Sequence, residues 1–354
     1  MIQKILIGIG LGVGLVACNV GQTTLQNDWN HAELRQKVKL VQTLTTTYWG
    51  DQIQKNRSDW DTYVLYNEMG NIIEKKGWAL NGNLSYRQER LYDVEGRLVT
   101  QTTYTGRKKR EERQTFRYDE WGNCIEHKNV SDRKQEITQM VYDESGNLLE
   151  STYDRNGHPV HRQVSVFNDK GQLLTYQDYH NDGTLNYESQ YSYTNADKTV
   201  DIKTVNAEQE ELSRLQLKKD EQSNTIERSS FHAGDSLPYK RKQYAYNKKG
   251  LETSYKAYVL EQLTVDRTTA YDRKGRVIAL KEYKGANQLK EHYTMHYDAK
   301  GNLIKKIVYD KAGEATQTLT WEYQYDKERN WIQKKAYEEE ILQTITTRNI
   351  EYYR

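Results

Sequence analysis

The stretch Tyr297-Asp298-Ala299-Lys300-Gly301-Asn302 recurs along the chain in near-copies, and its spacing decides the fold. The same Tyr-Asp-x-x-Gly-Asn pattern begins at Tyr118 and at Tyr142. Steps of 24 to 28 residues separate most of the aromatic residues that open the pattern or a close variant, which are Tyr66, Tyr92, Tyr118, Tyr142, Phe167, Tyr193, Tyr246, Tyr271, Tyr297 and Tyr325. The one double step, from 193 to 246, contains a decayed copy near Lys219 to Asn224. Such a period predicts a tandem-repeat architecture.

The residues that lead into each copy alternate as a β-strand does. Tyr293, Met295 and Tyr297 share one parity, whereas the residues between them are polar or small. Side chains of one parity point to one face of a strand, so one face of the sheet is predicted to be apolar and rich in tyrosine. A second strand follows each Gly, and each repeat is therefore a β-hairpin.

The Asp-x-x-Gly segment between the two strands has the chemistry of a tight turn. The Asp carboxylate accepts hydrogen bonds from nearby backbone N–H groups, and Gly adopts the positive φ that a type I turn with a bulge requires. We assign a structural role in the turns to Asp119, Gly122, Asp143, Gly146, Asp272, Gly275, Asp298 and Gly301.

The predicted fold is all-β, with tandem antiparallel hairpins of about 26 residues forming a twisted, spiralling or solenoid-like sheet. The repeat domain is residues 63–354, preceded by a tether and capping segment at 18–62 in which Asn27 or Asp28 caps a short helix. We expect six of the tyrosines that open the repeats to turn inward, namely Tyr118, Tyr142, Tyr246, Tyr271, Tyr297 and Tyr325.

Residues 1–17 have the pattern of a signal peptide. Lys4 precedes an apolar run from Ile5 to Leu15, and the segment ends in Leu-Val-Ala-Cys at Cys18. The run is too short to span a membrane as a helix. It resembles a bacterial lipoprotein signal with its lipobox, which implies cleavage before Cys18 and acylation of that residue. We expect a lipid-anchored protein of the bacterial cell envelope, at the outer membrane because Asn19 is not Asp; the alternative is a buried N-terminal helix.

The repeat unit, Tyr-Asp-x-x-Gly-Asn followed by Leu-Leu at Leu148 or Leu-Ile at Leu303, resembles the YD/RHS repeat. The resemblance covers about residues 63–354 and implies a spiralling antiparallel sheet that forms a shell. Together with the lipobox, it is similar to small RHS-repeat bacterial lipoproteins. The chain differs from the polymorphic-toxin members because it is far shorter and ends in repeat-like strands.

No catalytic or cofactor motif stands out. The sequence has no His-Glu-x-x-His, no phosphate-binding Gly loop and no Gly-x-Ser-x-Gly. The turn Asp residues lack the clustered carboxylates of a calcium loop. We therefore predict no enzyme activity, no metal and no cofactor. The 52 basic and 50 acidic residues give a formal net charge of +2, so no global field favours nucleic acid.

The leading hypothesis is a membrane-anchored protein that presents an extended β-surface to a protein or glycan partner. The alternatives are a relative of RHS toxin shells acting in delivery or immunity and, third, a hydrolase. The candidate binding residues are Trp121 and Trp331 at turn positions and Phe231 in an irregular exposed loop. Residues 198–237 lack the Tyr and Gly residues that mark the other repeats, and they are either a binding site or a decayed repeat. If Cys18 is acylated, Cys124 is the single remaining thiol.

Overall fold

A computed structural model describes residues 28–32, 34–50, 52–55, 58–106 and 110–354. One short helix, α1 (Asp28–His31), precedes the strands. The strands are β1 (Val38–Trp49), β2 (Gln52–Lys55), β3 (Thr62–Tyr66), β4 (Ile72–Trp78), β5 (Leu84–Tyr92), β6 (Leu98–Thr105), β7 (Arg110–Tyr118), β8 (Cys124–Ser131), β9 (Lys134–Tyr142), β10 (Leu148–Arg155), β11 (His158–Phe167), β12 (Leu173–His180), β13 (Leu185–Thr194), β14 (Thr199–Val205), β15 (Glu211–Lys219), β16 (Thr225–His232), β17 (Lys240–Tyr246), β18 (Glu252–Val259), β19 (Gln262–Tyr271), β20 (Val277–Lys284), β21 (Gln288–Tyr297), β22 (Leu303–Tyr309), β23 (Ala315–Tyr325), β24 (Trp331–Glu338) and β25 (Ile341–Tyr352).

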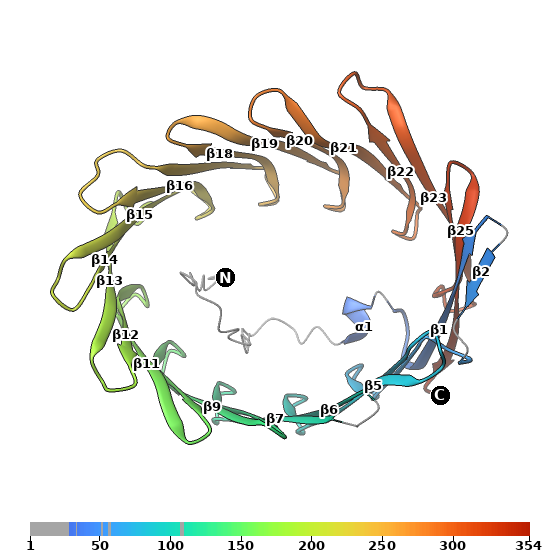
Figure 1. The fold of residues 1–354 in the computed structure, drawn as a ribbon, viewed down its shortest axis with the longest axis horizontal. Helices are drawn as coiled ribbons and strands as arrows, with labels where there is room; N and C mark the ends of the chain where they lie inside the picture. The colour runs from blue at the N-terminus through green and yellow to red at the C-terminus, as the bar shows by residue number, and fades with distance from the viewer. Residues whose placement is uncertain (1–27, 33, 51, 56–57, 107–109) are drawn as a thin grey trace.

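The strands form one antiparallel sheet that closes on itself as an oval ring (Figure 1). From β3 to β25 each strand pairs with the next, and β1 then pairs with both β3 and β25. The result is a barrel of 24 strands, with β2 attached only to β1. The antiparallel hairpins are confirmed, but the prediction of an open, spiralling sheet is wrong. Closure satisfies the two edges that an open sheet would expose.

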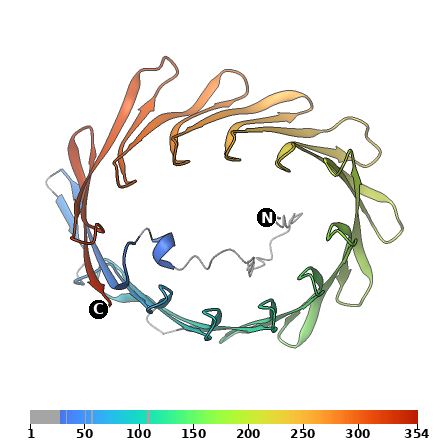
Figure 2. The ribbon, with the colours of Figure 1, turned by 180° about the vertical axis from the view of Figure 1, so that it is seen from behind.

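The Asp-x-x-Gly turns have the predicted geometry. Gly301 has a φ of 105°, and Oδ1 of Asp298 accepts the N–H of Asn302 at 2.8 Å. Positive φ and an Asp carboxylate that accepts the N–H four residues on recur at Asp119 with Gly122, Asp143 with Gly146 and Asp272 with Gly275. At one end of the barrel the turns bend toward its centre, and at the other end the loops splay outward (Figures 1 and 2).

The position of α1 shows which parity of each strand faces inward. α1 lies inside the ring (Figure 2), and its Trp29 packs against Val41 of β1 and Tyr66 of β3. Residues that pair across neighbouring strands point to the same face of the sheet. The pairing register therefore places the tyrosines that open the repeats on the inner wall. The prediction that they turn inward is therefore correct. Alternate positions form the outer wall, where ion pairs such as Arg87–Glu74 and Arg162–Glu150 lie between neighbouring strands.

The repeat tyrosines bind one hairpin to the next through their hydroxyl groups. Tyr118 Oη donates to the carbonyl of Leu98, the first residue after the turn of the preceding repeat, at 2.8 Å. The equivalent bonds, at 2.8 to 2.9 Å, are Tyr92–Ile72, Tyr193–Leu173, Tyr246–Thr225, Tyr271–Glu252 and Tyr297–Val277. In the repeat that Tyr325 opens, the bond to the carbonyl of Leu303 comes from Tyr323, and Tyr325 donates to the carboxylate of Asp298 instead. Because each ring reaches back over the neighbouring hairpin, it couples consecutive repeats as well as covering the sheet.

The N-terminal segment joins the two ends of the repeat array. Trp29, Leu34 and Val38 form a buried cluster with Tyr66, and residues of β25 pack against it. The buried side chain of Asn330 hydrogen-bonds both the backbone N–H and the carbonyl of Arg35 at 2.8 and 2.9 Å. The carboxylate of Asp28 accepts the N–H of Ile72 in β4, and the other predicted cap, Asn27, lies outside the described residues. The segment therefore fixes the first and last repeats together.

Residues 198–237 are ordinary hairpin strands. They contain β14, β15, all of β16 and most of the loop at 233–239. The decayed copy at Asp220 keeps the turn, since its carboxylate accepts the N–H of Asn224 at 2.8 Å. Ser223 takes the positive φ that Gly has elsewhere, 65°. The segment is a divergent repeat rather than a break in the architecture.

Removing one tyrosine hydroxyl should weaken the coupling between repeats. Tyr271→Phe leaves the carbonyl of Glu252 without this donor, and we expect a loss of about 1 kcal/mol in the free energy of unfolding, measured in urea. Tyr337→Phe is the control, because that hydroxyl bonds Glu322 on the exposed outer wall, and it should cost less than about 0.5 kcal/mol. Equal losses would contradict the coupling role.

Candidate functional site: the inner wall of the barrel

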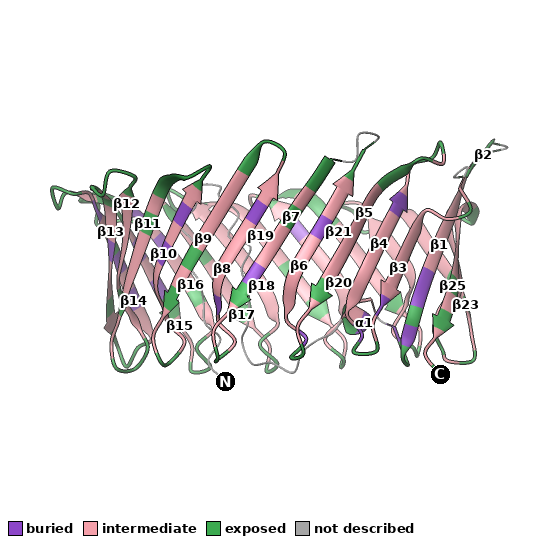
Figure 3. Ribbon diagram, turned by 90° about the horizontal axis from the view of Figure 1, so that it is seen from below, coloured by how far each residue is buried: buried purple, intermediate pink, exposed green. Residues whose placement is uncertain are grey.

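The barrel is too wide for its own side chains to fill. With ~4.8 Å between strands and a tilt of ~40°, a circular barrel of this size has a backbone radius of about 24 Å. Aromatic residues on the inner wall, including Tyr255, Tyr293 and Trp321, stay partly exposed. Figure 3 shows that most residues along the strands are of intermediate burial. The inner wall is therefore a concave surface lined by aromatic and polar side chains.

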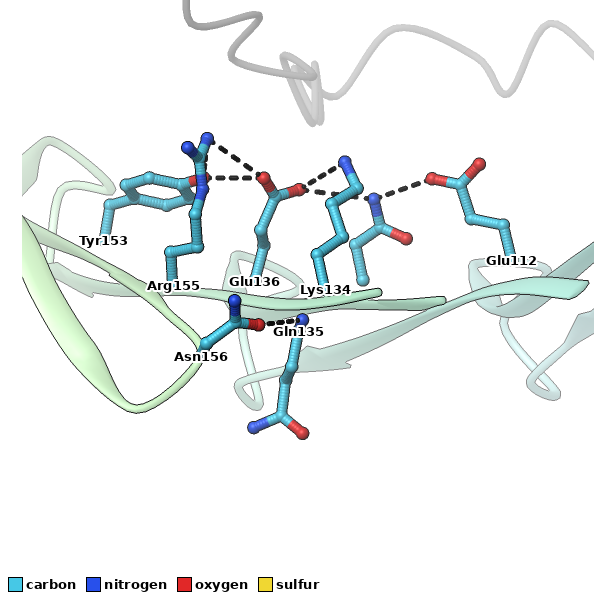
Figure 4. Close-up of polar contacts among 8 residues, drawn as sticks. Glu112, Lys134, Gln135, Glu136, Tyr153, Arg155 and Asn156 are labelled. Atoms are coloured by element: carbon cyan, nitrogen blue, oxygen red, sulfur yellow. Dashed lines mark hydrogen bonds and ion pairs between the residues drawn. The ribbon is translucent and has the colours of Figure 1, made fainter. Parts of the chain in front are cut away.

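A network of polar side chains lies on the inner wall of β7 to β10 (Figure 4). Glu136 is its centre: one carboxylate oxygen accepts the Tyr153 hydroxyl at 2.8 Å and the other accepts the Lys134 ammonium at 2.9 Å. Arg155 contacts the same carboxylate at 3.2 Å, and its guanidinium also donates to the Tyr153 hydroxyl. Asn129 donates to Glu112 at 2.8 Å. Figure 4 shows these side chains on one side of the sheet and Gln135 on the other.

The environment of Glu136 keeps it ionised. Burial raises the pKa of this carboxyl, but the hydrogen bonds from Lys134 and Tyr153 outweigh burial, and the pKa lies below its ordinary value. Burial and the Glu136 carboxylate raise the pKa of Tyr153, so its hydroxyl keeps its proton. Both groups already have partners. This arrangement suits orienting side chains on the wall better than accepting or donating a proton in catalysis.

The inner wall from β17 to β25 is rich in cations. The register places Lys240, Lys242, Lys284, Lys306, Lys334 and Arg348 on it. The inward carboxylates of the same strands are Glu282, Glu291 and Glu338, and Glu282 already pairs with Lys290 at 2.7 Å. Among the described residues, none of the five inward lysines in this set lies within 4 Å of a carboxylate. This half of the wall has an excess of positive charge.

The cations are densest around Trp331 on β24. The Arg348 guanidinium lies 3.4 Å from the centre of the Trp331 indole ring. Lys334 Nζ lies 5.8 Å from the Trp321 ring and 5.9 Å from the Tyr323 ring, while Tyr323 packs edge-on against Trp331. Burial lowers the pKa of Lys334, and the charge of Arg348 lowers it further. Two cations thus stand side by side in an aromatic frame.

The predicted binding residues do not come together. Trp331 is the first residue of β24 rather than a turn residue, and it belongs to the inner cluster just described. Trp121 is 66% exposed in the turn between β7 and β8. Phe231 is 7% exposed in β16, beneath the guanidinium of Arg214 at 4.1 Å, so the prediction that it lies in an exposed loop is wrong. Its side chain serves packing on the outer wall.

Two other predicted residues have no part in the inner cluster. Cys124 is 1% exposed at the start of β8, where its thiol contacts the carbonyl of Glu126. Cys18 and the signal peptide lie outside the described residues, so their lipidation stays a prediction.

Sequence reasoning missed the residues that give the inner wall its character. Lys334, Arg348 and Trp321 were not singled out, although the alternation that places Tyr323 inward also places Trp321 inward. Lys334 could be recognised as inward only from its pairing with Tyr323 across β23 and β24. That pairing depends on the turn and bulge, which single-strand periodicity does not specify.

Two negative findings concern the described part of the chain. No group of three or more His, Cys, Asp or Glu residues is arranged there to hold a metal ion. No helix there is long and apolar enough to cross a membrane.

The described geometry defines a class of protein, a closed ring of Tyr-Asp hairpins with tyrosines directed inward. A family model, the Teneurin YD-shell, matches residues 51–209. Over these residues the chain is similar to the YD/RHS-repeat family, as its turns and repeat spacing indicated. No curated protein matches the sequence.

Solved structures with similar arrangements include the TcdB2-TccC3 complex without its hypervariable C-terminal region, at 14% identity, with 87% of this chain and 19% of that chain covered and a TM-score of 0.37. A variant Tc holotoxin pore of Photorhabdus luminescens matches at 13% identity, covering 80% and 19%, with a TM-score of 0.29. A porin-like protein from Bacteroides uniformis matches at 9% identity, covering 89% and 96%, with a TM-score of 0.28. The chain spans about a fifth of the length of the first two, and all three scores are below 0.5.

Acid should remove the stabilisation that Glu136 provides. Its folded-state pKa lies below the unfolded value of about 4.3, so the stabilisation is present above that pH and is lost as pH falls through the folded-state pKa. We expect Glu136→Gln to destabilise the protein at pH 7 and to differ less from wild type near pH 3, measured by urea unfolding. Glu144→Gln, in an exposed turn, is the control and should change stability little. A difference that does not shrink with falling pH would contradict this role.

Proposed function

We propose that the chain is a lipid-anchored protein of the bacterial cell envelope that binds a glycan or protein on the inner wall of its closed barrel. The observation that carries the proposal is that this wall keeps aromatic and cationic side chains partly exposed in a barrel too wide to fill. Exposed aromatic area on a concave surface is typical of ligand-binding grooves.

The contrast between the two walls supports an inner binding surface. Outward charged residues are largely matched across strands, as in Lys218–Glu227 and Arg162–Glu150, whereas the five inward lysines of β17 to β25 named above have no such partners. Charge left unmatched on a concave surface with aromatic neighbours is available to a ligand. A binding role requires no catalytic group, in keeping with the saturated contacts of Glu136.

The position of α1 supports an orientation relative to the membrane. Trp29 N donates to the carbonyl of Gly70, which places α1 at the end of the barrel that carries the Asp-x-x-Gly turns. Ten residues separate Cys18 from Asp28, and they span at most about 35 Å when extended. If Cys18 is acylated, this end of the barrel faces the membrane and the splayed loops face away.

A second candidate function is the enclosure of a polypeptide, in delivery or immunity. The match to the YD-shell family and the closed wall favour it. Tyr191 and Tyr193 pack against a buried cluster of Val200, Ile202, Leu215 and Leu217, and the exposed parts of these two rings would suit a protein segment. Protease treatment of captured material distinguishes the two: a glycan survives it and a polypeptide does not.

A bulky group attached to the inner wall should block binding. Thr269 faces inward and Thr268 faces outward on β19, next to each other in the chain. We expect that Thr269→Cys labelled with maleimide–polyethylene glycol no longer retains the ligand from an envelope extract, measured as bound protein and bound sugar. The labelled Thr268→Cys protein should bind like wild type. Loss of binding in both, or in neither, would place the binding surface elsewhere.

Anchoring should depend on one thiol. Cys18→Ser removes the residue that the lipobox pattern marks for acylation, and we expect the protein to leave the membrane fraction and to lack acyl chains in mass spectrometry. Cys124→Ser is the matched control, since Cys124 is buried in β8, and it should remain in the membrane fraction. A wild-type protein with an intact Met1 or an unmodified Cys18 would disprove the anchor.

A further inference from the structure

We propose that the inner wall of β23, β24, β25 and β1 binds an acidic polysaccharide, with Lys334 and Arg348 pairing with its carboxylates and Trp321 and Trp331 lying against its sugar rings. This inference rests on the proposed function, because it names the ligand class of the same wall. It requires that cations, flat apolar surfaces and hydroxyl groups lie together, and the four strands supply all three.

The cations are held in place before a ligand arrives. The Arg348 guanidinium lies 3.4 Å from the centre of the Trp331 ring, and this cation–π contact holds its charge beside Lys334. Lys334 is half-buried opposite Tyr323 and close to Trp321. Two like charges side by side disfavour each other until an anion lies between them. An anionic group bound here relieves that repulsion.

The aromatic rings suit the apolar faces of sugars. Trp321, Tyr323 and Trp331 lie on inward positions of β23 and β24. Tyr323 packs edge-on against Trp331, and Lys334 lies near the rings of both Trp321 and Tyr323. Each ring is partly exposed. Indole and phenol rings provide broad apolar area with little loss of conformational entropy on binding.

Hydroxyl groups continue the surface beyond the cations. The register of β1 with β25 places Thr43, Thr45 and Thr47 of β1 inward beside Arg348, Thr346 and Thr344 of β25. Thr45 and Thr346 lie 3.2 Å apart between their hydroxyl oxygens. Threonine hydroxyls both donate and accept hydrogen bonds, as sugar hydroxyls do. A polymer that leaves the cationic cluster along this strip meets matching polar groups.

The same observations favour a glycan over two other acidic polymers. An acidic peptide commonly binds by adding a strand to an open sheet edge, and this ring pairs β1 with both neighbours. A single-stranded nucleic acid requires cations that follow its phosphates at regular intervals. Here two cations are followed by hydroxyl groups, which fits scattered carboxylates.

The test measures binding of three acidic glycans, oligogalacturonate, hyaluronan and polysialic acid, to the purified full chain by calorimetry. We expect at least one to bind, and its methyl-esterified form to bind at least tenfold more weakly, since esterification removes the charge. Poly-glutamate and oligo-deoxythymidine of equal charge should bind more weakly than that glycan. Absence of binding by all three glycans, or equal or tighter binding by either competitor polymer, would overturn the inference.

Neighbouring lysines on opposite walls provide the matched variants. Lys334→Glu should weaken glycan binding at least tenfold, and Lys335→Glu, which changes the adjacent outward residue, should weaken it less than twofold. Thermal unfolding of both variants shows that they fold. Equal effects of the two would overturn the site. If the label at position 269 blocks capture from envelope extract but no acidic glycan binds, the inner-wall function stands and only the ligand class is wrong.

Discussion

The hydrogen bond from each repeat tyrosine to the preceding hairpin is the interaction on which this structure depends. The described strands form a single layer, and no second sheet or layer of helices covers its inner face within the part of the chain that the structure describes. Each ring, as at Tyr118, lies over the neighbouring hairpin, and its hydroxyl satisfies a carbonyl there. The ring and the hydrogen bond together provide the contact between repeats that stacking provides in other repeat proteins. This requirement explains why tyrosine, rather than phenylalanine, opens almost every repeat.

Such coupling needs a preceding hairpin, so the first repeat requires another solution. Tyr66 has no earlier hairpin, and Trp29 packs against its ring instead, 6.4 Å between ring centres. At the other end Tyr353 reaches across the seam, and its hydroxyl donates to the carbonyl of Tyr66 at 2.5 Å. The last tyrosine of the chain therefore makes with the first repeat the kind of contact that successive repeats make with each other. Closure and repeat stacking use the same chemistry.

The local parts of this fold could be predicted and the closure could not. The turns follow from Asp298 and Gly301 alone, and the inward face follows from the alternation of Tyr293, Met295 and Tyr297, because both depend on residues close in sequence. The pairing of Leu44 with Thr347 joins residues some 300 positions apart and has no local signal. An open spiral and a closed ring contain the same hairpins, so the hairpin pattern in the sequence does not distinguish the two. For the candidate site, Trp331 was singled out from its predicted turn position, whereas the partners Lys334 and Arg348 depend on cross-strand register.

Closure also changes what the inner face can do. In a narrow or tightly wound sheet the inward tyrosines would fill the interior, and binding would be left to the turns and loops. A ring of 24 strands instead keeps the far wall away, so that Trp321 and Trp331 stay partly exposed on the inner wall. The wall that a charged side chain faces then depends on its place in the strand alternation. Lys334 and Lys335 are neighbours in sequence, but Lys334 adds to the positive potential inside the ring, whereas Lys335 faces outward. A cation inside a concave wall is surrounded by more protein and less water than one outside, so its field is less screened. The unmatched lysines of β17 to β25 therefore act together on whatever enters the barrel, and the matched pairs of the outer wall do not.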